Sequence, residues 1–327
     1  MRSLVVLSLA ACAASALASF DMMLLANGID NRIHRYDPAN NVALGSFPVN
    51  GSITDIAVNQ SANTVYTLLP SGSSTGIAKY NYNTGAYLGA TLLAGSYGNA
   101  RKVQYTSNGE LLVSYERDVV RYNADTGAQI GVPLFYSDRR FIFHGGSAYL
   151  SNGNFVLAGE SDGTAWNNDY LMTFTPTGTQ TGSVMSSLHQ SVHSYADIVS
   201  NQNSSALMVT EQSGGSSVTF TRYNVNGSAI AATNISLSIG GTSITALGSE
   251  WGHNNLAYCL FYNPGTQVTT CYQLDTTLNL IGSGTTISAL SGSANAYRGS
   301  AMILAPEPSS MLAVLAGLGL LARRRRS

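Results

Sequence analysis

Short runs in which hydrophobic and polar residues alternate make up most of the chain, and turns rich in Gly and Asn separate them. One unit recurs: an aromatic residue, two or three small polar residues, a turn residue and a second alternating run. Its six copies begin at Tyr36, Tyr80, Tyr122, Phe174, Tyr223 and Tyr272, with separations of 44, 42, 52, 49 and 49 residues. Alternation with a period of two indicates β-strands, and a repeat of about 40–50 residues is typical of β-propeller blades.

Each repeat divides into four short strands, which is the composition of a propeller blade. The predicted first strands cover residues 53–59, 101–107, 147–151, 195–200 and 244–249. The predicted second strands cover residues 64–69, 111–116, 155–159, 206–211 and 256–262. The third strand carries the aromatic residue, and the fourth follows the turn, as at 86–93 and 128–135. These runs account for five complete blades.

The remaining runs complete a sixth blade from both ends of the repeat region. Residues 21–27, 32–36 and 42–49 read as second, third and fourth strands without a first, and 297–304 reads as a first strand without a blade. Pairing them removes the exposed edge of an open array. The sequence therefore predicts an all-β fold, a six-bladed β-propeller over residues 19–305 closed three-plus-one by its C-terminal strand. A seven-bladed ring and a sandwich pair are the alternatives.

The first 18 residues have the pattern of a secretory signal peptide. Arg2 precedes an apolar run from Leu4 to Leu17, and Ala16-Leu17-Ala18 is a small-x-small cleavage site. The run is short for a permanent anchor, which needs about 20 apolar residues. It also continues past Cys12, which disfavours a lipoprotein reading. We therefore expect export and transient contact with signal peptidase.

The last 22 residues form a second segment that is separate from the repeats. Pro306-Glu307-Pro308 precedes an apolar run at 311–322, and Arg323, Arg324, Arg325 and Arg326 follow. Arginines cross a bilayer at high cost, so the cluster stays cytoplasmic while the exported body lies outside. Residues 306–327 are thus predicted to be a stop-transfer tail with a short transmembrane helix in the inner membrane.

The order of motif, short apolar helix and terminal arginine cluster resembles the PEP-CTERM sorting signal of Gram-negative-type bacteria. The resemblance covers about 22 residues. It implies transient recognition by an exosortase, processing near Pro306-Glu307-Pro308, and a place at the cell surface or in the extracellular matrix. Proteins with this signal are commonly linked to exopolysaccharide and biofilm matrix. A plain single-helix tail anchor is the alternative.

Composition excludes two classes of protein. With 44% hydrophobic residues, mean hydropathy +0.07 and a formal net charge of -1, the chain does not have the pattern of a disordered protein. The two terminal segments contain five of the 16 Lys and Arg and one of the 17 Asp and Glu, so the body carries about 11 - 16 = -5. An acidic body disfavours binding to a phosphate backbone, and no nucleic-acid partner is expected.

Cys259 and Cys271 flank a predicted hairpin turn at 263–267. A symmetric hairpin pairs position i with 530 - i, which places the two cysteines opposite each other. In an exported protein such a pair fits a cross-strand disulfide, although a directly opposed pair is strained. Two buried free thiols are the alternative.

A ligand-binding rim is predicted where the loops entering the first strands meet those between second and third strands, around the channel opening. The repeat positions bring basic and aromatic residues to this face. Such a face suits an anionic or sugar ligand, including a polysaccharide. The predicted rim consists of Arg101, Lys102, Arg139, Arg140, His144, His189, His193, Tyr195, Tyr297 and Arg298. A scatter of unrelated loop side chains is the alternative.

Two further constellations are weak, and no catalytic signature is present. His189, His193 and Asp197 have helical spacing in a segment that is not convincingly helical. Glu160, Asp162 and Asp169 lack the spacing of a calcium loop. We therefore expect no catalytic residues, no cofactor and no bound metal. The sequence favours a non-enzymatic, exported binding or structural module; a secreted carbohydrate-active or lactonase-like enzyme is the alternative.

Overall fold

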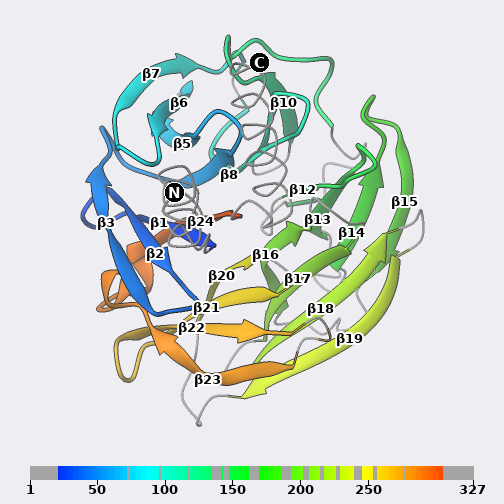
Figure 1. Ribbon diagram of the computed structural model, residues 1–327. Helices are drawn as coiled ribbons and strands as arrows, with labels where there is room; N and C mark the ends of the chain where they lie inside the picture. The colour runs from blue at the N-terminus through cyan, green and yellow to red at the C-terminus, as the bar shows by residue number, and fades with distance from the viewer. Residues whose placement is uncertain are drawn as a thin grey trace, which may run out of the picture.

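The computed structural model describes residues 21–304 apart from short gaps. The gaps are 72–73, 96, 116–117, 135–140, 143–146, 162–168, 186–192, 202–205, 214–216, 226–228, 239–244, 253–255, 276 and 278. Figure 1 shows sheets arranged around a central axis, so the fold is all-β and propeller-like. Two short 3-10 turns, η2 (Ser288–Leu290) and η3 (Ala294–Ala296), precede the last strand. No helix within these residues is long and apolar enough to cross a membrane. The predicted leader 1–18 and tail 306–327 lie outside them.

The first sheet joins the two ends of the repeat region. Its strand order is β24 (Tyr297–Ile303), β1 (Met22–Asn27), β2 (Arg32–Asp37) and β3 (Val42–Pro48). β24 lies antiparallel to β1, with Met22 opposite Ile303 and Leu25 opposite Ser300. The predicted three-plus-one closure is confirmed by this pairing (Figure 1).

Four more sheets have at least four strands, all antiparallel. The second is β4 (Asp55–Asn59), β5 (Thr64–Ser71), β6 (Ser74–Asn81) and β7 (Tyr87–Leu92). The fourth joins β11 (Phe141–Ile142), β13 (Phe155–Ser161), β14 (Asp169–Phe174) and β15 (Gln180–Met185), with β12 (Ser147–Tyr149) also paired to β13. The fifth is β16 (His193–Ser200), β17 (Ala206–Ser213), β18 (Ser217–Val225) and β19 (Ala229–Ser238). The sixth is β20 (Thr245–Trp251), β21 (Ala257–Asn263), β22 (Val268–Leu274) and β23 (Leu280–Thr286).

The third sheet has only three strands, β8 (Ala100–Tyr105), β9 (Glu110–Tyr115) and β10 (Val119–Asn123). The predicted fourth strand at 128–135 makes two isolated bridges, Tyr122 to Gln129 and Val119 to Leu134. Gly131 has φ +69° and Pro133 has no N–H, so a continuous ladder cannot form there. The prediction of six complete blades is therefore wrong: five blades are complete. No seventh blade or sandwich pair occurs in the described part of the chain.

Apolar clusters fill the layers between neighbouring sheets. Consecutive residues of one strand serve different layers: Leu24 packs with the second sheet, whereas Leu25 packs with the sixth. Further clusters lie between each remaining pair of neighbours. Alternate side chains point to opposite faces of a strand, and both faces are buried here. Strands with apolar residues at consecutive positions, such as β1, therefore contribute to two apolar layers around the axis.

The polar residue after Tyr36, Tyr80 and Tyr122 makes the turn that ends the third strand of each of these three repeats. Asp37 Oδ1 accepts hydrogen bonds from the backbone N–H groups two and three residues later, both at 3.0 Å. Asn81 and Asn123 make the same pair of bonds at their turns. Asp and Asn favour such turns because their side chains mimic a backbone acceptor. The repeat thus encodes both the strand and its end.

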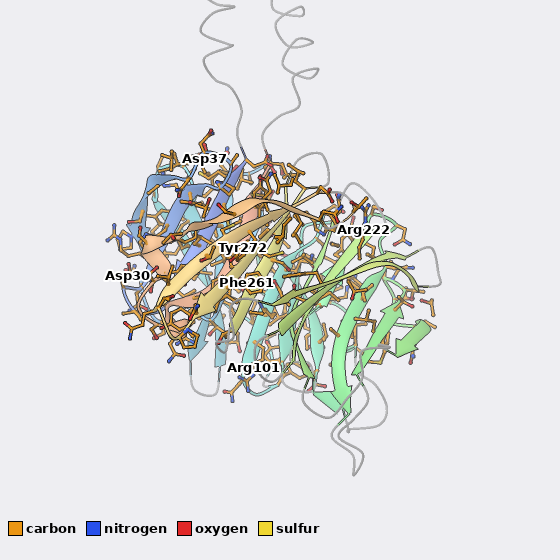
Figure 2. All side chains as sticks on the ribbon, turned by 90° about the horizontal axis from the view of Figure 1, so that it is seen from below. Asp30, Asp37, Arg101, Arg222, Phe261 and Tyr272 are labelled. Carbon is orange, nitrogen blue, oxygen red and sulfur yellow. The ribbon has the colours of Figure 1, made fainter. Side chains whose placement is uncertain are left out.

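The innermost strand of each sheet lines the axis. These strands are β24, β4, β8, β12, β16 and β20, and neighbours in this order contact one another around the ring. Arg101, near the start of β8, and Asp37, at the end of β2, lie at opposite faces of the ring (Figure 2). Side chains halfway along the inner strands therefore meet inside the fold, between its two faces.

Candidate functional site

Ionisable side chains from four inner strands meet on the axis. They are Asp55 on β4, Lys102 on β8, Asp197 on β16 and Glu250 on β20. With Tyr297 and Ser300 from β24 they line a cavity of about 130 Å³. We call these six residues the axial cluster. Such a concentration of charge inside a small protein core is stable only when its members are paired or hydrogen-bonded.

Two of the acids connect neighbouring blades through backbone hydrogen bonds. Asp55 Oδ2 accepts from the N–H of Val103 on β8 at 2.7 Å, and Asp55 is 4% exposed. Asp197 Oδ2 accepts from the N–H of Ser249 on β20 at 2.8 Å. In both cases the acceptor lies on one inner strand and the donor on the next. These two carboxylates therefore fix the spacing of adjacent inner strands.

Lys102 spans the axis between sheets that are not neighbours. Its Nζ lies 3.4 Å from Asp197 Oδ1. This ion pair joins the third sheet to the fifth, and the Lys102 side chain extends past β12 of the fourth sheet to reach it. β12 has three residues and contributes only Ser147 to the cavity wall, which leaves room for the long side chain. The side chains of Lys102 and Asp197 are 21% and 8% exposed. Lys102 therefore acts as a crossbar inside the ring.

Glu250 belongs to a hydrogen-bonded chain with β24. Ser300 Oγ donates to Glu250 Oε1 at 2.8 Å, and Tyr297 Oη lies 3.0 Å from Ser300 Oγ. Because the single Ser300 proton goes to Glu250, the Tyr297 hydroxyl donates to Ser300. The chain connects the sixth sheet with the strand that closes the ring.

Two acids of the axial cluster, Asp55 and Glu250, have raised pKa values. Burial raises the pKa of Asp55 to about 7, against the opposing effects of Lys102 and the Val103 N–H. Burial, with the Asp197 carboxylate next, raises the pKa of Glu250 to about 8. Burial alone would lower the pKa of Lys102, but the carboxylates of Asp197 and Asp55 outweigh it and raise that pKa. Near neutral pH the cluster therefore combines the Lys102 cation with two acids, Asp55 and Glu250, that are protonated or partly protonated.

A second, larger cavity opens where the inner strands end. Its volume is about 380 Å³, and Glu250 and Met302 line both this cavity and the axial one. We call its lining the channel mouth. It consists of Val58, Asn59, Gln60, Ser61, Tyr105, Ser107, Ser200, Asn201, Glu250, Trp251, Gly252, Met302 and Leu304. Ligand pockets span about 300–1,000 Å³, so the mouth is large enough for a ligand and the axial cavity is not.

The predicted rim is only partly assembled, and the larger opening lies at the other end of the inner strands. Lys102 and Tyr297 are brought together, but inside the axial cluster. Arg101 and Arg298 are exposed and belong to neither cavity. His193 and Tyr195 lie on β16, while Arg139, Arg140, His144 and His189 are outside the described residues. For these four residues outside the description, the rim stays a prediction.

The histidine and acid constellations do not form a metal site in the described residues. His193 and Asp197 belong to strand β16, not to a helix, which agrees with the rejection of a helical site. Glu160 lies opposite Asp169 in the ladder between β13 and β14, and Asp162 is outside the described residues. No group of three or more His, Cys, Asp or Glu is placed to hold a metal ion among the side chains that the structure describes.

The predicted disulfide between Cys259 and Cys271 is wrong; both are buried free thiols. Cys259 lies opposite Tyr272, and Cys271 lies opposite Leu260. The pairing sum is 531 rather than 530, because Asn263 pairs with Val268 across a four-residue loop. A shift of one residue sends a side chain to the other face of a sheet. Cys259 accordingly packs toward the fifth sheet and Cys271 toward the first.

Asp55 and Glu250 are not among the residues that the sequence analysis singles out, and Asp197 appears there only with two histidines, although a signal for Asp55 and Asp197 exists. Residues 55–60 read Asp-Ile-Ala-Val-Asn-Gln, and residues 197–202 read Asp-Ile-Val-Ser-Asn-Gln. The two segments are 142 residues apart and start equivalent stretches of inner strand, three sheets apart. Comparing first strands with one another, rather than the aromatic turns, would have identified both inward-facing acids.

Comparisons with known proteins extend to the fold only. Neither a protein-family model nor a curated protein sequence matches the chain. A solved structure titled a nidogen/laminin complex aligns with a TM-score of 0.61 and 12% identity, covering 87% of this chain and 98% of that one. A protein of unknown function from Bacteroides caccae aligns with a TM-score of 0.58 and 12% sequence identity, covering 87% of this chain and 99% of that one. Hydrazine synthase from Kuenenia stuttgartiensis aligns with a TM-score of 0.56 and 10% sequence identity, covering 77% of this chain and 73% of that one. At these identities, the similarity establishes a β-propeller body.

Proposed function

We propose that this chain is an exported, non-catalytic propeller that acts as a polysaccharide-binding or structural module at the cell surface or in the extracellular matrix. The observation that carries the proposal is the composition of the channel mouth. Its described lining offers three side-chain amides and several hydroxyls but a single carboxyl, Glu250. Hydrolysis of a glycosidic bond uses two carboxyl groups that flank the scissile bond. The mouth therefore suits binding of a saccharide better than its cleavage.

The enzyme alternative has one observation in its favour. Asp55 and Glu250 have pKa values raised to about 7 and 8, which suits general acid and base catalysis near neutral pH. The cavity that contains both is about 130 Å³, too small for a sugar chain. A carbohydrate-active or lactonase-like reaction would need the axial cavity to open. We therefore rank this function second.

The binding proposal predicts retention without turnover. Exported protein purified from cells should bind a panel of soluble polysaccharides in affinity electrophoresis and release no reducing sugar from any of them. Its Glu250→Gln variant keeps the acceptor for Ser300 and should bind equally well. Reducing-sugar release that disappears in Glu250→Gln would instead support the enzyme. Absence of binding to every polysaccharide by the wild-type protein would contradict the module.

Export and sorting remain part of the proposal, with signal peptidase and an exosortase as transient partners. The ring-closing strand β24 ends at Ile303, three residues before Pro306. Processing at Pro306-Glu307-Pro308 would therefore remove the apolar run and the four arginines without removing a strand of the propeller. This spacing supports the assignment of 306–327 as a detachable tail.

Processing of the tail is expected to be visible in the mass of the mature protein. Intact-mass analysis of surface-extracted protein should show loss of residues 1–18 and of the residues beyond the Pro-Glu-Pro motif. Replacement of Glu307 by Ala should leave the full-length tail in the inner membrane fraction. A surface form that retains Arg323–Arg326 would contradict processing but leave the propeller and its ligand unaffected.

A further inference from the structure

The channel mouth has the size and position of a ligand site on the face opposite the predicted rim. The ends of the inner strands surround it: Asn59 ends β4, Tyr105 ends β8, and Trp251 ends β20. Its cavity of about 380 Å³ lies in the range of pockets for small ligands. Glu250 and Met302 form its inner end, toward the axial cluster. Behind the mouth Lys102 crosses the axis, with its Nζ 3.4 Å from Asp197 Oδ1.

Charge in the mouth disfavours ionic ligands. Its described lining contains no Lys, Arg or His, so a carboxylate, sulfate or phosphate finds no cationic partner there. The one acid, Glu250, already accepts a hydrogen bond from Ser300. Burial favours its neutral form, which removes the main attraction for a cation. A neutral ligand therefore fits the electrostatics of the mouth best.

The polar groups of the mouth are held in place before any ligand arrives. Asn59 Nδ2 donates to the Tyr105 hydroxyl at 2.8 Å, and Asn59 Oδ1 accepts from Ser61 Oγ at 2.7 Å. The Gln60 side chain forms two hydrogen bonds with the backbone of Leu304. Each amide nitrogen carries two hydrogens. Asn59 also hydrogen-bonds the Tyr66 side chain, whereas Gln60 keeps donor capacity beyond its bond to Leu304. A hydroxyl-rich ligand can use that capacity.

Tyr105 adds an oriented aromatic surface to this polar set. Its ring stacks on Tyr66, with centroids 5.3 Å apart and an angle of 11° between the planes. The contact with Asn59 fixes the hydroxyl end of the same ring. A fixed aromatic side chain supplies contact area at a low cost in conformational entropy. Amides, hydroxyls and one held aromatic ring are together suited to a ring with one apolar and several hydroxylated sides.

We infer that the channel mouth binds neutral saccharide, one or two sugar units at a chain end or branch, and not the acidic polysaccharide that the predicted basic rim would favour. This inference rests on the proposed function and names its ligand class and its face. It places recognition at Asn59, Gln60 and Tyr105, with Arg101 and Arg298 outside the site.

Steric blocking of the mouth tests the inference with little risk to folding. Ser61 and Ser107 are exposed residues of the lining, in the turns that follow β4 and β8, so Ser107→Trp and Ser61→Trp fill the mouth from different turns without disturbing the core. Ser52→Trp is the matched control, because Ser52 is an exposed serine before β4 and outside both cavities. Circular dichroism and the thermal midpoint should show the same fold in all three variants of the exported protein.

Binding is measured by affinity electrophoresis at about 0.15 M salt with two kinds of probe, neutral glucans and mannans on one side and polygalacturonate on the other. Wild type and Ser52→Trp should bind a neutral polymer, each mouth variant should bind it at least tenfold more weakly, and polygalacturonate should not bind. Unchanged binding in both mouth variants would overturn the inference. So would retention of polygalacturonate that is lost in Arg101→Ser with Arg298→Ser, although the binding module itself would stand. If wild type binds no polysaccharide, the proposed function fails as well.

Discussion

Replacement of Lys102 by Met should lower the free energy of unfolding by about 3–5 kcal/mol at pH 8, because removing one partner leaves buried carboxylates without their cation. Lys102 pairs with Asp197 at 3.4 Å and opposes the rise in the pKa of both Asp55 and Glu250. Met fills a similar volume, so the loss of charge dominates. The measurement is urea-induced unfolding followed by fluorescence.

The deficit of Lys102→Met should depend on pH in a defined direction. In the unfolded chain Asp and Glu titrate near about 4, whereas Asp55 and Glu250 titrate at about 7 and 8 when folded. Between these values the folded state binds more protons, so stability falls as pH rises. Without Lys102 the folded pKa values of both acids rise further and this window widens. The variant should therefore lie closer to wild type at pH 5 than at pH 8.

Lys79→Met is the matched control for this prediction. Lys79 also lies on a strand and pairs with an aspartate, but the Asp125 side chain is 90% exposed. Surface ion pairs contribute about 0–1 kcal/mol, so this variant should lose little stability at either pH. Equal stability of Lys102→Met and wild type at pH 8 would mean that the crossbar does not stabilise the ring.

The fold was readable from the sequence because its two main signals are local. Alternating apolar and polar residues predict strands, and the Asx turns after Tyr36, Tyr80 and Tyr122 mark where one strand ends and the next begins. The closure of β24 on β1 followed from counting strands, since one unpaired first strand remained at one end and three later strands at the other. These inferences need no long-range geometry.

The errors arose where one residue decides the outcome. The hairpin after Asn263 has a loop of four residues, and this single-residue difference moves Cys271 to the other face from Cys259. The strand predicted at 128–135 has suitable composition, yet Gly131 and Pro133 prevent a continuous ladder. Periodicity reports that a segment resembles a strand, but it contains neither the register nor the backbone angles of individual turn residues.

The site was harder to predict because the sequence does not tell whether a side chain near the end of an inner strand points to the axis or to the surface. The basic and aromatic residues near the starts of inner strands predict an accessible rim, whereas Lys102 and Tyr297 turn inward and their charge and hydroxyl are used inside the ring. The channel mouth is built from Asn, Gln and Ser, which are common in every loop of this chain. Their assembly is visible only when the inner strands are placed around an axis.

Gly299→Ala should destabilise the protein by at least about 2 kcal/mol, because no space exists for a methyl group between β24 and β4. A Cβ at this position would lie 2.1 Å from Asp55 Oδ1 and 3.1 Å from both Asp55 Cα and Ile56 N. Asp55 cannot retreat without losing its 2.7 Å hydrogen bond from Val103 N–H. The substitution therefore acts on ring closure and on the axial cluster at once. Thermal and urea unfolding measure the effect.

Gly76→Ala on β6 controls for the loss of a glycine from a strand. Its added Cβ would meet nothing closer than 3.8 Å, and Ala is intrinsically better than Gly inside a strand, so stability should stay equal or rise slightly. The double variant Asp55→Ala with Gly299→Ala removes the closest contact and should cost less than the sum of the two single changes. Additive costs would mean that the backbone contacts with Asp55 and Ile56, not the carboxyl group, set the requirement for glycine. A Gly299→Ala protein as stable as wild type would contradict the tight apposition of β24 and β4 altogether.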